Sequence, residues 1–155
     1  MTRTIELIVN GRRRRITVAD DELLLDVLRT EFGTTSVREG CGVGACGACT
    51  VLVEGRSVSS CLARAVRHDG TRITTADGLP NDDDVVERFV EAGAMQCGYC
   101  IPGFVLMSHE LLAENPAPSQ ADIDAHLEGN ICRCGTYQEI RAAIAATAES
   151  RAVTA

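Results

Sequence analysis

Apolar and polar residues alternate over the first twenty positions of the chain, as they do in half-buried strands. Apolar side chains occupy every second position from 5 to 9 and again from 16 to 18. Asn10 and Gly11, which lie between the two runs, are the residues that a tight type I′ turn prefers. We therefore predict an antiparallel hairpin at the start of the chain.

The spacing of apolar residues then changes to that of a helix. Leucine and valine residues at positions 23–28 share one helical face, Asp20 and Asp21 are candidate N-caps, and Gly33 is a candidate stop. A stretch rich in glycine follows at positions 40–47. We predict one helix and then a loop in this part of the chain.

Strand patterning returns after the loop. Short runs at positions 50–53 and 57–62 flank a Glu54–Gly55 turn, and a further short strand is expected at 72–75. Together with the first hairpin and the helix, these strands predict a compact α+β unit. Strand patterning stops near Gly78, and we expect the first domain to span residues 1–78.

Helical spacing dominates residues 79–155, which we expect to form a second, all-α domain of four helices. The first contains the apolar residues of positions 85–90, and the second starts near Pro102, whose fixed φ suits a first turn. Ser119 suits the N-cap of the third, and an alanine-rich stretch around Ile140 predicts the fourth.

Composition narrows the functional classes. The chain has 155 residues, of which 45% are apolar, so a hydrophobic core can form. A net charge of -7 and an aromatic content of 3%, with no tryptophan, argue against a nucleic-acid interface. The sequence contains no apolar run near the roughly 18 residues of a membrane helix. We expect neither a nucleic-acid partner nor a membrane span.

The first residues enter the strand pattern at once, without the apolar region of a secretion signal. Residues 12–15 are all arginine, but the segment that follows them is short and acidic, so we expect a solvated strand edge and not an export signal. The chain is therefore expected in the cytoplasm, where thiols stay reduced. Its eight cysteines then indicate metal binding and not disulfides.

Four cysteines in the first half have the spacing of plant-type 2Fe-2S ferredoxins, Cys-x4-Cys-x2-Cys with a distant fourth. They are Cys41, Cys46, Cys49 and Cys61. Such a cluster takes three thiolates from one loop that wraps it and a fourth from a neighbouring element. The glycines between these cysteines let the loop adopt φ > 0 and bring N–H groups close to sulfur.

Other sites are compatible with parts of this loop. Gly42, Gly44 and Gly47 match the G-x-G-x-x-G pattern of a dinucleotide loop, but no apolar strand leads into them. Four thiolates also suit tetrahedral zinc, although this spacing is unusual for it. A disulfide is the weakest of these alternatives.

The remaining cysteines form two close pairs in the second half, Cys97 with Cys100 and Cys132 with Cys134. The first pair alone would suit thiol–disulfide exchange at a helix start. Thiols one residue apart bridge each other poorly, but both can reach a cluster from one loop. Two pairs at helix starts therefore predict a second cluster, favoured by the N–H groups of the helix N-termini.

Three segments together resemble a known family, the iron–sulfur subunit of xanthine dehydrogenase and related molybdenum hydroxylases. They are Gly40–Val51 (GCGVGACGACTV), Gln96–Gly103 (QCGYCIPG) and Gly129–Cys134 (GNICRC). The resemblance extends from about residue 4 to about residue 148 and includes all eight cysteines in order.

This resemblance implies a β-grasp 2Fe-2S ferredoxin-like domain followed by a four-helix 2Fe-2S-binding domain. It implies an oxidoreductase in which a large subunit holds a molybdenum-pterin cofactor and a medium subunit holds FAD. The present chain would be the electron-transfer subunit, without substrate chemistry of its own, in a dimer of heterotrimers.

The resemblance also assigns site residues. Cysteines of the second half would hold the cluster nearest the pterin, and those of the first half would hold the outer cluster. Gln96 and Cys134 would lie beside the pterin. Many members have Thr-Gly after the last ligand where this chain has Gly135–Thr136, so we expect a different turn there.

Two further functions are compatible with the cysteines themselves. One is a free ferredoxin-like electron carrier, for which the second domain is unnecessary. The other is an interaction module stabilised by zinc, which would be colourless.

Overall fold

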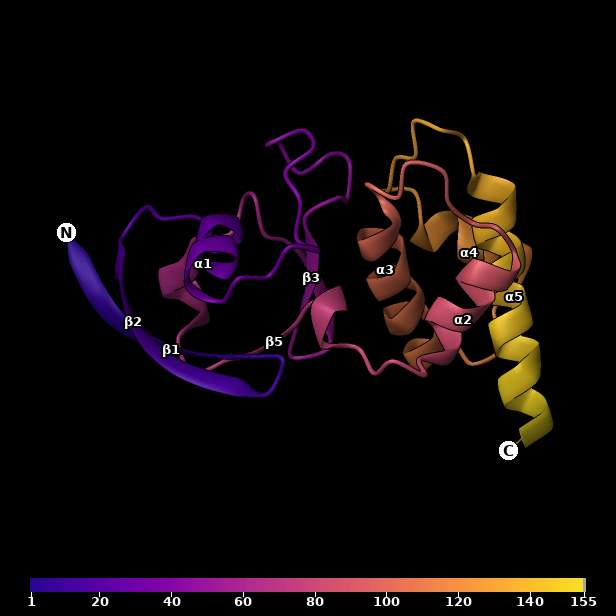
Figure 1. The fold of residues 1–155 in the computed structure, drawn as a ribbon, viewed down its shortest axis with the longest axis horizontal. Coiled ribbons are helices and arrows are strands. Elements are labelled where there is room, and N and C mark those ends of the chain that lie inside the picture. Colours follow the sequence, from indigo (N-terminus) through magenta and orange to yellow (C-terminus); the bar gives the residue numbers. More distant parts are fainter. Residues whose placement is uncertain (155) are drawn as a thin grey trace.

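A mixed β-sheet occupies one end of the molecule and a bundle of helices occupies the other (Figure 1). The structure, a computed structural model, describes residues 1–154. Strand β3 (Thr50–Val53) and helix α3 (Ile101–Glu114) face each other where the two halves meet (Figure 1). The expected α+β architecture is confirmed.

The sheet has the strand order β2-β1-β5-β3-β4. Its other strands are β1 (Thr2–Val9), β2 (Arg12–Ala19), β4 (Arg56–Ser59) and β5 (Arg72–Thr74). β1 and β5 are parallel, and the other neighbours are antiparallel. The first hairpin is confirmed, with Asn10 and Gly11 at positive φ in its turn. β2 is an edge strand, and most of its arginine side chains are exposed, as predicted.

The start of helix α1 (Leu24–Glu31) corrects one prediction. The N-cap position is Leu23, and not Asp20 or Asp21. Carbonyl groups of Ser60 and Ala63, just beyond β4, accept hydrogen bonds from the first N–H groups of the helix. Because these residues serve α1, β4 ends at position 59 and does not continue to 62 as predicted.

Helices dominate the second half, as expected. Besides α3 they are α2 (Asp84–Glu91), α4 (Gln120–His126) and α5 (Tyr137–Thr154), and 3-10 turns η1 (Ala65–His68) and η2 (Ala76–Gly78) lie in the first half. Asp83 caps α2, and Ser119 caps α4 in a capping box with Asp122. Within residues 1–154, no helix has both the length and the apolar content to cross a bilayer.

Each half has its own hydrophobic core. The first core joins the sheet to α1 and includes the fully buried Leu7 and Leu24. The second core joins the helices to one another and includes the fully buried Phe104 and Ile140. Burial of these apolar side chains is the main stabilising contribution within each half.

Helix α3 joins the two halves. Its Glu110 side chain is 6% exposed and accepts a hydrogen bond from the backbone N–H of Ser57 in β4 at 2.9 Å. Nearer the start of α3, Gly103 packs against Gly47, so closely that a Cβ added at position 103 would lie 2.2 Å from the Gly47 carbonyl oxygen. Both the edge of the sheet and the loop that precedes β3 therefore rest on this helix.

Candidate metal centres

The first four predicted ligands converge at the open end of the second hairpin. The cysteine loop (residues 40–49) runs directly into β3, and Cys61 follows β4. Strands β3 and β4 pair with Thr50 opposite Ser59, so Cys49 meets Ser60 just outside the pair, and the thiol of Cys61, the next residue, lies beside that of Cys49. The Ser60 hydroxyl fixes this arrangement by donating to the Cys49 carbonyl oxygen at 2.7 Å.

The cysteine loop is shaped by glycines at positive φ. Gly42, Gly44 and Gly47 have φ values of 66°, 72° and 71°. The turn directs the backbone N–H groups of Val43 and Ala45 toward the Cys41 sulfur, at 3.4 and 3.2 Å. A strand, and not the helix that a dinucleotide site requires, follows the loop, so the G-x-G-x-x-G alternative is wrong.

The thiols of this first set form two pairs, Cys41 with Cys46 and Cys49 with Cys61. Backbone N–H groups of the loop lower the pKa of Cys41 to about 7. Burial, followed by the hydrogen bond with Cys49, raises the pKa of Cys61 to about 11. The outer part of the site thus favours the thiolate, and its buried part favours the thiol until a metal replaces the proton.

The other four predicted ligands lie at two helix starts. Cys97 and Cys100 precede α3, and Cys132 and Cys134 precede α5. Thiol contacts cross between the two motifs, pairing Cys97 with Cys134 and Cys100 with Cys132. Each pair therefore takes one sulfur from each motif, and all eight cysteines of the chain are free thiols. The alternatives that require a disulfide find no support in this arrangement.

The pKa values of the second set are also shifted in opposite directions. Burial raises the pKa of Cys100 to about 12. Burial acts in the same direction on Cys132, but hydrogen bonds, first of all those from the Thr136 hydroxyl and N–H, outweigh it and lower the pKa to about 7. The N–H of Tyr99 lowers the pKa of Cys97. Both thiol pairs therefore contain a sulfur prepared to bind as thiolate, the form that coordinates metal.

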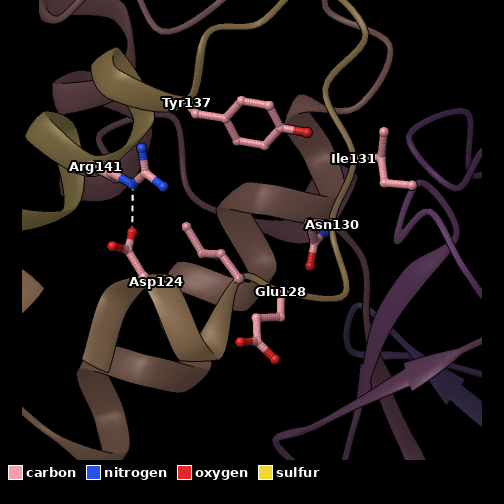
Figure 2. Close-up of a pocket in the computed structure, with 7 residues that line it drawn as sticks. Asp124, Glu128, Asn130, Ile131, Tyr137 and Arg141 are labelled. Carbon is pink, nitrogen blue, oxygen red and sulfur yellow. Dashed lines mark hydrogen bonds and ion pairs between the residues drawn. The ribbon is translucent and has the colours of Figure 1, made fainter. Parts of the chain in front are cut away.

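Residues at the start of α5 hold the loop that carries Cys132. The Tyr137 hydroxyl accepts a hydrogen bond from the Cys132 N–H at 2.8 Å, and the Thr136 hydroxyl oxygen lies 3.2 Å from the Cys132 sulfur. Figure 2 shows Tyr137 reaching across a pocket of about 380 Å³ toward this loop, above the Arg141–Asp124 ion pair. Hydrogen bonds with Thr136 and Tyr137 thus fix the position of this ligand loop.

The donor set of each site fits a 2Fe-2S cluster. Such a cluster has two irons held by four cysteine thiolates, and both sets supply two pairs of thiols. A single tetrahedral zinc ion instead needs its donors around one point. Within residues 1–154, no group of three or more His, Cys, Asp or Glu side chains surrounds one such point. The neighbouring thiols of each set therefore fit the two irons of a cluster.

The two sites meet at the interface between the halves. The Ile131 N–H, one residue before a ligand of the second set, donates to the carbonyl oxygen of Cys46 at 3.0 Å. In Figure 2 the Ile131 side chain lies on the side of its loop that faces the first half of the chain. A cavity of about 240 Å³ between the sites is lined by cysteines of both sets, Cys41, Cys46, Cys97 and Cys100.

A second contact across this interface uses residues that were not predicted. Arg38 donates to the Gly98 carbonyl oxygen at 2.6 Å and stacks over the Tyr99 ring at 5.3 Å. The Tyr99 hydroxyl donates to the carbonyl oxygen of Glu39 at 2.7 Å. These contacts link segments about 60 residues apart in the chain, so no local sequence pattern reveals them.

Gln96 lies at the surface of the protein, next to Cys97 of the second ligand set. Its side chain is exposed, and its amide nitrogen is 3.5 Å from the Cys134 carbonyl oxygen. The structure therefore brings together the two residues that the family resemblance predicts beside a pterin.

Comparison with known families divides the chain into two cluster-binding regions. The family described as 2Fe-2S iron-sulfur cluster binding domain matches residues 7–76. The family described as 2Fe-2S binding domain matches residues 75–145. Both matches include four of the cysteines described above.

Similar proteins of known name cover almost the whole chain. The nicotinate dehydrogenase small FeS subunit of Eubacterium barkeri is 44% identical over 144 residues, which are 91% of this chain and 92% of that protein. The xanthine dehydrogenase iron-sulfur-binding subunit of Escherichia coli is 39% identical over 145 residues, 90% of this chain and 90% of that protein.

Solved structures of related oxidoreductases share the fold of this chain. Quinoline 2-oxidoreductase from Pseudomonas putida 86 matches with a TM-score of 0.91 at 36% identity, over 98% of this chain and 97% of that chain. Aldehyde oxidoreductase from Desulfovibrio gigas matches with a TM-score of 0.92 at 34% identity, over 98% of this chain but only 17% of that much longer chain.

Proposed function

The chain belongs to the family of small iron–sulfur subunits of xanthine dehydrogenase-type oxidoreductases, and we propose that it conducts electrons from a molybdenum-pterin centre on a large subunit to FAD on a medium subunit. The family carries electrons through 2Fe-2S clusters, and this chain has two regions that bind them. The donor, the acceptor and the direction of flow are the proposed parts.

We assign the inner cluster to Cys97, Cys100, Cys132 and Cys134, and the outer cluster to Cys41, Cys46, Cys49 and Cys61. The thiol pairs of each set support this assignment, because they match the two irons of a 2Fe-2S cluster. When bound, each cluster supplies a centre that accepts and releases electrons. The chain's own contribution is to hold the sulfurs, direct N–H groups at them and keep the two sites in contact.

The contact between the ligand loops is the observation that carries the proposal. Ile131 precedes an inner ligand, and its N–H donates to the carbonyl of Cys46, an outer ligand, at 3.0 Å. A short path of covalent bonds and one hydrogen bond therefore joins the two sites. A free carrier with one cluster has no use for such a junction.

We further propose that Gln96 and Cys134 contact the pterin of the large subunit, since Gln96 is exposed beside the Cys134 carbonyl. The two separate cores support a domain boundary between residues 78 and 79. A dimer of heterotrimers in the cytoplasm is the assembly proposed from the family resemblance.

Metal analysis of protein purified without oxygen tests this function. We expect about four irons and about four acid-labile sulfides per chain, and two distinct EPR signals after dithionite reduction. The chain should also co-purify with larger subunits that contain molybdenum and flavin. Zinc without sulfide, or isolation of the native chain with no partner and no molybdenum, would contradict the proposal.

A further inference from the structure

A surface hollow lies beside the site assigned to the outer cluster. Its volume is about 550 Å³. The residues that line it belong to β4 and to the segment between β4 and the end of η1, and they are Val58, Leu62, Ala63, Arg64, Arg67 and His68. The ligand contacts described above use none of these side chains.

Leu62 connects the hollow to the ligands. It follows Cys61, which is 3% exposed, whereas Leu62 itself is 59% exposed. The side chain also contacts the cysteine loop, because a Cβ added at Gly44 would lie 2.4 Å from the Leu62 Cδ1 atom. A molecule seated in the hollow would therefore be separated from the outer site by little more than this one apolar side chain.

Two arginines give the hollow a positive rim. Arg64 and Arg67 are exposed, and their i, i+3 spacing across a 3-10 turn puts them on one side of it. The turn is fixed, because Ala65 is fully buried and donates its N–H to the Glu22 carbonyl oxygen. Within residues 1–154, neither guanidinium makes an ion pair.

The distribution of charge along the chain agrees with a basic surface in this half. Residues 1–78 contain 11 arginines against 10 acidic residues, whereas residues 79–155 contain 4 against 12. The acidic character of the chain is thus confined to the helical half, and the half with the hollow is slightly basic. Opposite charge across an interface increases the rate and the specificity of association.

We propose that this hollow docks an acidic segment of the electron-accepting subunit. Leu62, which lines the hollow beside Cys61, supplies an apolar contact, and Arg64 and Arg67 pair with carboxylates of the partner. The inference rests on the proposed function, since it names the surface through which the acceptor subunit binds. It adds the chemistry of that surface, which combines apolar side chains with two exposed arginines.

Charge reversal in the complete complex tests the proposal. We expect R64E/R67E to weaken retention of the flavin subunit at least tenfold during gel filtration and to slow flavin reduction by substrate, both more strongly at low salt. The matched control is R12E/R15E, because Arg12 and Arg15 are also exposed arginines without an ion pair within residues 1–154, but lie on β2. L62A measures the contribution of the apolar Leu62 side chain to retention of the flavin subunit.

The outcomes distinguish a failure of the docking surface from a failure of the proposed electron acceptor. Equal flavin retention and equal flavin reduction in R64E/R67E, the control and the wild type would overturn the docking surface. A wild-type complex without any flavin subunit would instead overturn the proposed acceptor. EPR signals from both clusters in every variant establish that the substitutions left the ligand sites intact.

A different contact carries a second inference, about the inner site. Thr136 is 4% exposed, and its hydroxyl oxygen lies 3.2 Å from the Cys132 sulfur. Once Cys132 binds iron as a thiolate, its sulfur has no proton to give, so the hydroxyl must be the donor. We infer that Thr136 is a positioning residue that sets the reduction potential of the inner cluster, because a hydrogen bond to sulfur favours the reduced, more negative state.

Redox titration followed by EPR tests this role. T136V should lower the midpoint potential of one cluster only, and T136S, which keeps the hydroxyl, should stay near the wild-type value. The unshifted second cluster serves as an internal control. Unchanged potentials in T136V with both signals present would overturn the inference. If valine prevents assembly of the inner cluster, T136A provides the same comparison with a smaller side chain.

Discussion

Replacement of Cys132 by serine is expected to abolish one cluster and to leave the other. Cys132 is 6% exposed, packs in the second hydrophobic core and pairs with Cys100 across the two ligand motifs. A serine hydroxyl remains protonated under conditions in which this thiol ionises, so one iron would lose a ligand. Iron per chain should fall from about four to about two, and one of the two EPR signals should disappear.

The reciprocal variant is C41S, which should remove the other signal. The two losses are expected to be independent because each set of ligands is supported by its own hydrophobic core. Loss of both signals in either variant would show that the clusters assemble together. Survival of both signals in C132S would contradict the ligand assignment itself.

Substitution of Gly103 by alanine is expected to separate the two halves. The added Cβ would lie 2.2 Å from the carbonyl oxygen of Gly47, and backbone on both sides leaves no flexible side chain to yield. α3 would have to move away from the cysteine loop, at a cost of about 3 kcal/mol in the free energy of unfolding. The same movement would lengthen the hydrogen bond from Ile131 to Cys46.

Urea unfolding followed by circular dichroism measures this cost, and EPR of the reduced protein reports the magnetic coupling between the clusters, which should weaken. Gly129→Ala is the matched control. A Cβ at Gly129 meets no atom within 4 Å, so we expect a change within about 0.5 kcal/mol and unaltered coupling. Equal stability of the two variants would show that the close contact at Gly103 is readily relieved.

Local patterns predicted the elements of this fold well, because alternation and helical spacing are set by which face of each segment is buried. The hairpin at Asn10–Gly11 and the cap at Ser119 are examples. The cysteine spacings also predicted two sets of ligands. In each case the information lies within a few neighbouring residues.

Contacts between distant segments could not be predicted in this way. The start of α1 takes its hydrogen bonds from carbonyl groups beyond β4, so the two aspartates that precede the helix gave the wrong cap. Nothing in the sequence pairs Arg38 with Gly98, or indicates which thiol of one motif contacts which thiol of the other. These features depend on the packing of the halves against each other.

The two borders of the β-sheet have consequences for self-association. An unprotected border strand is a template on which a second molecule can add its own strand. On β4 the outward N–H of Ser57 is already occupied by Glu110 of α3, and on β2 the exposed Arg12 and Arg15, which form no ion pair within residues 1–154, would repel the same arginines of an approaching copy. The β4 border is contacted by α3, and the β2 border is protected by charge repulsion. Two copies of this chain therefore have no ready way to polymerise through their sheets, and any higher assembly must form through other surfaces.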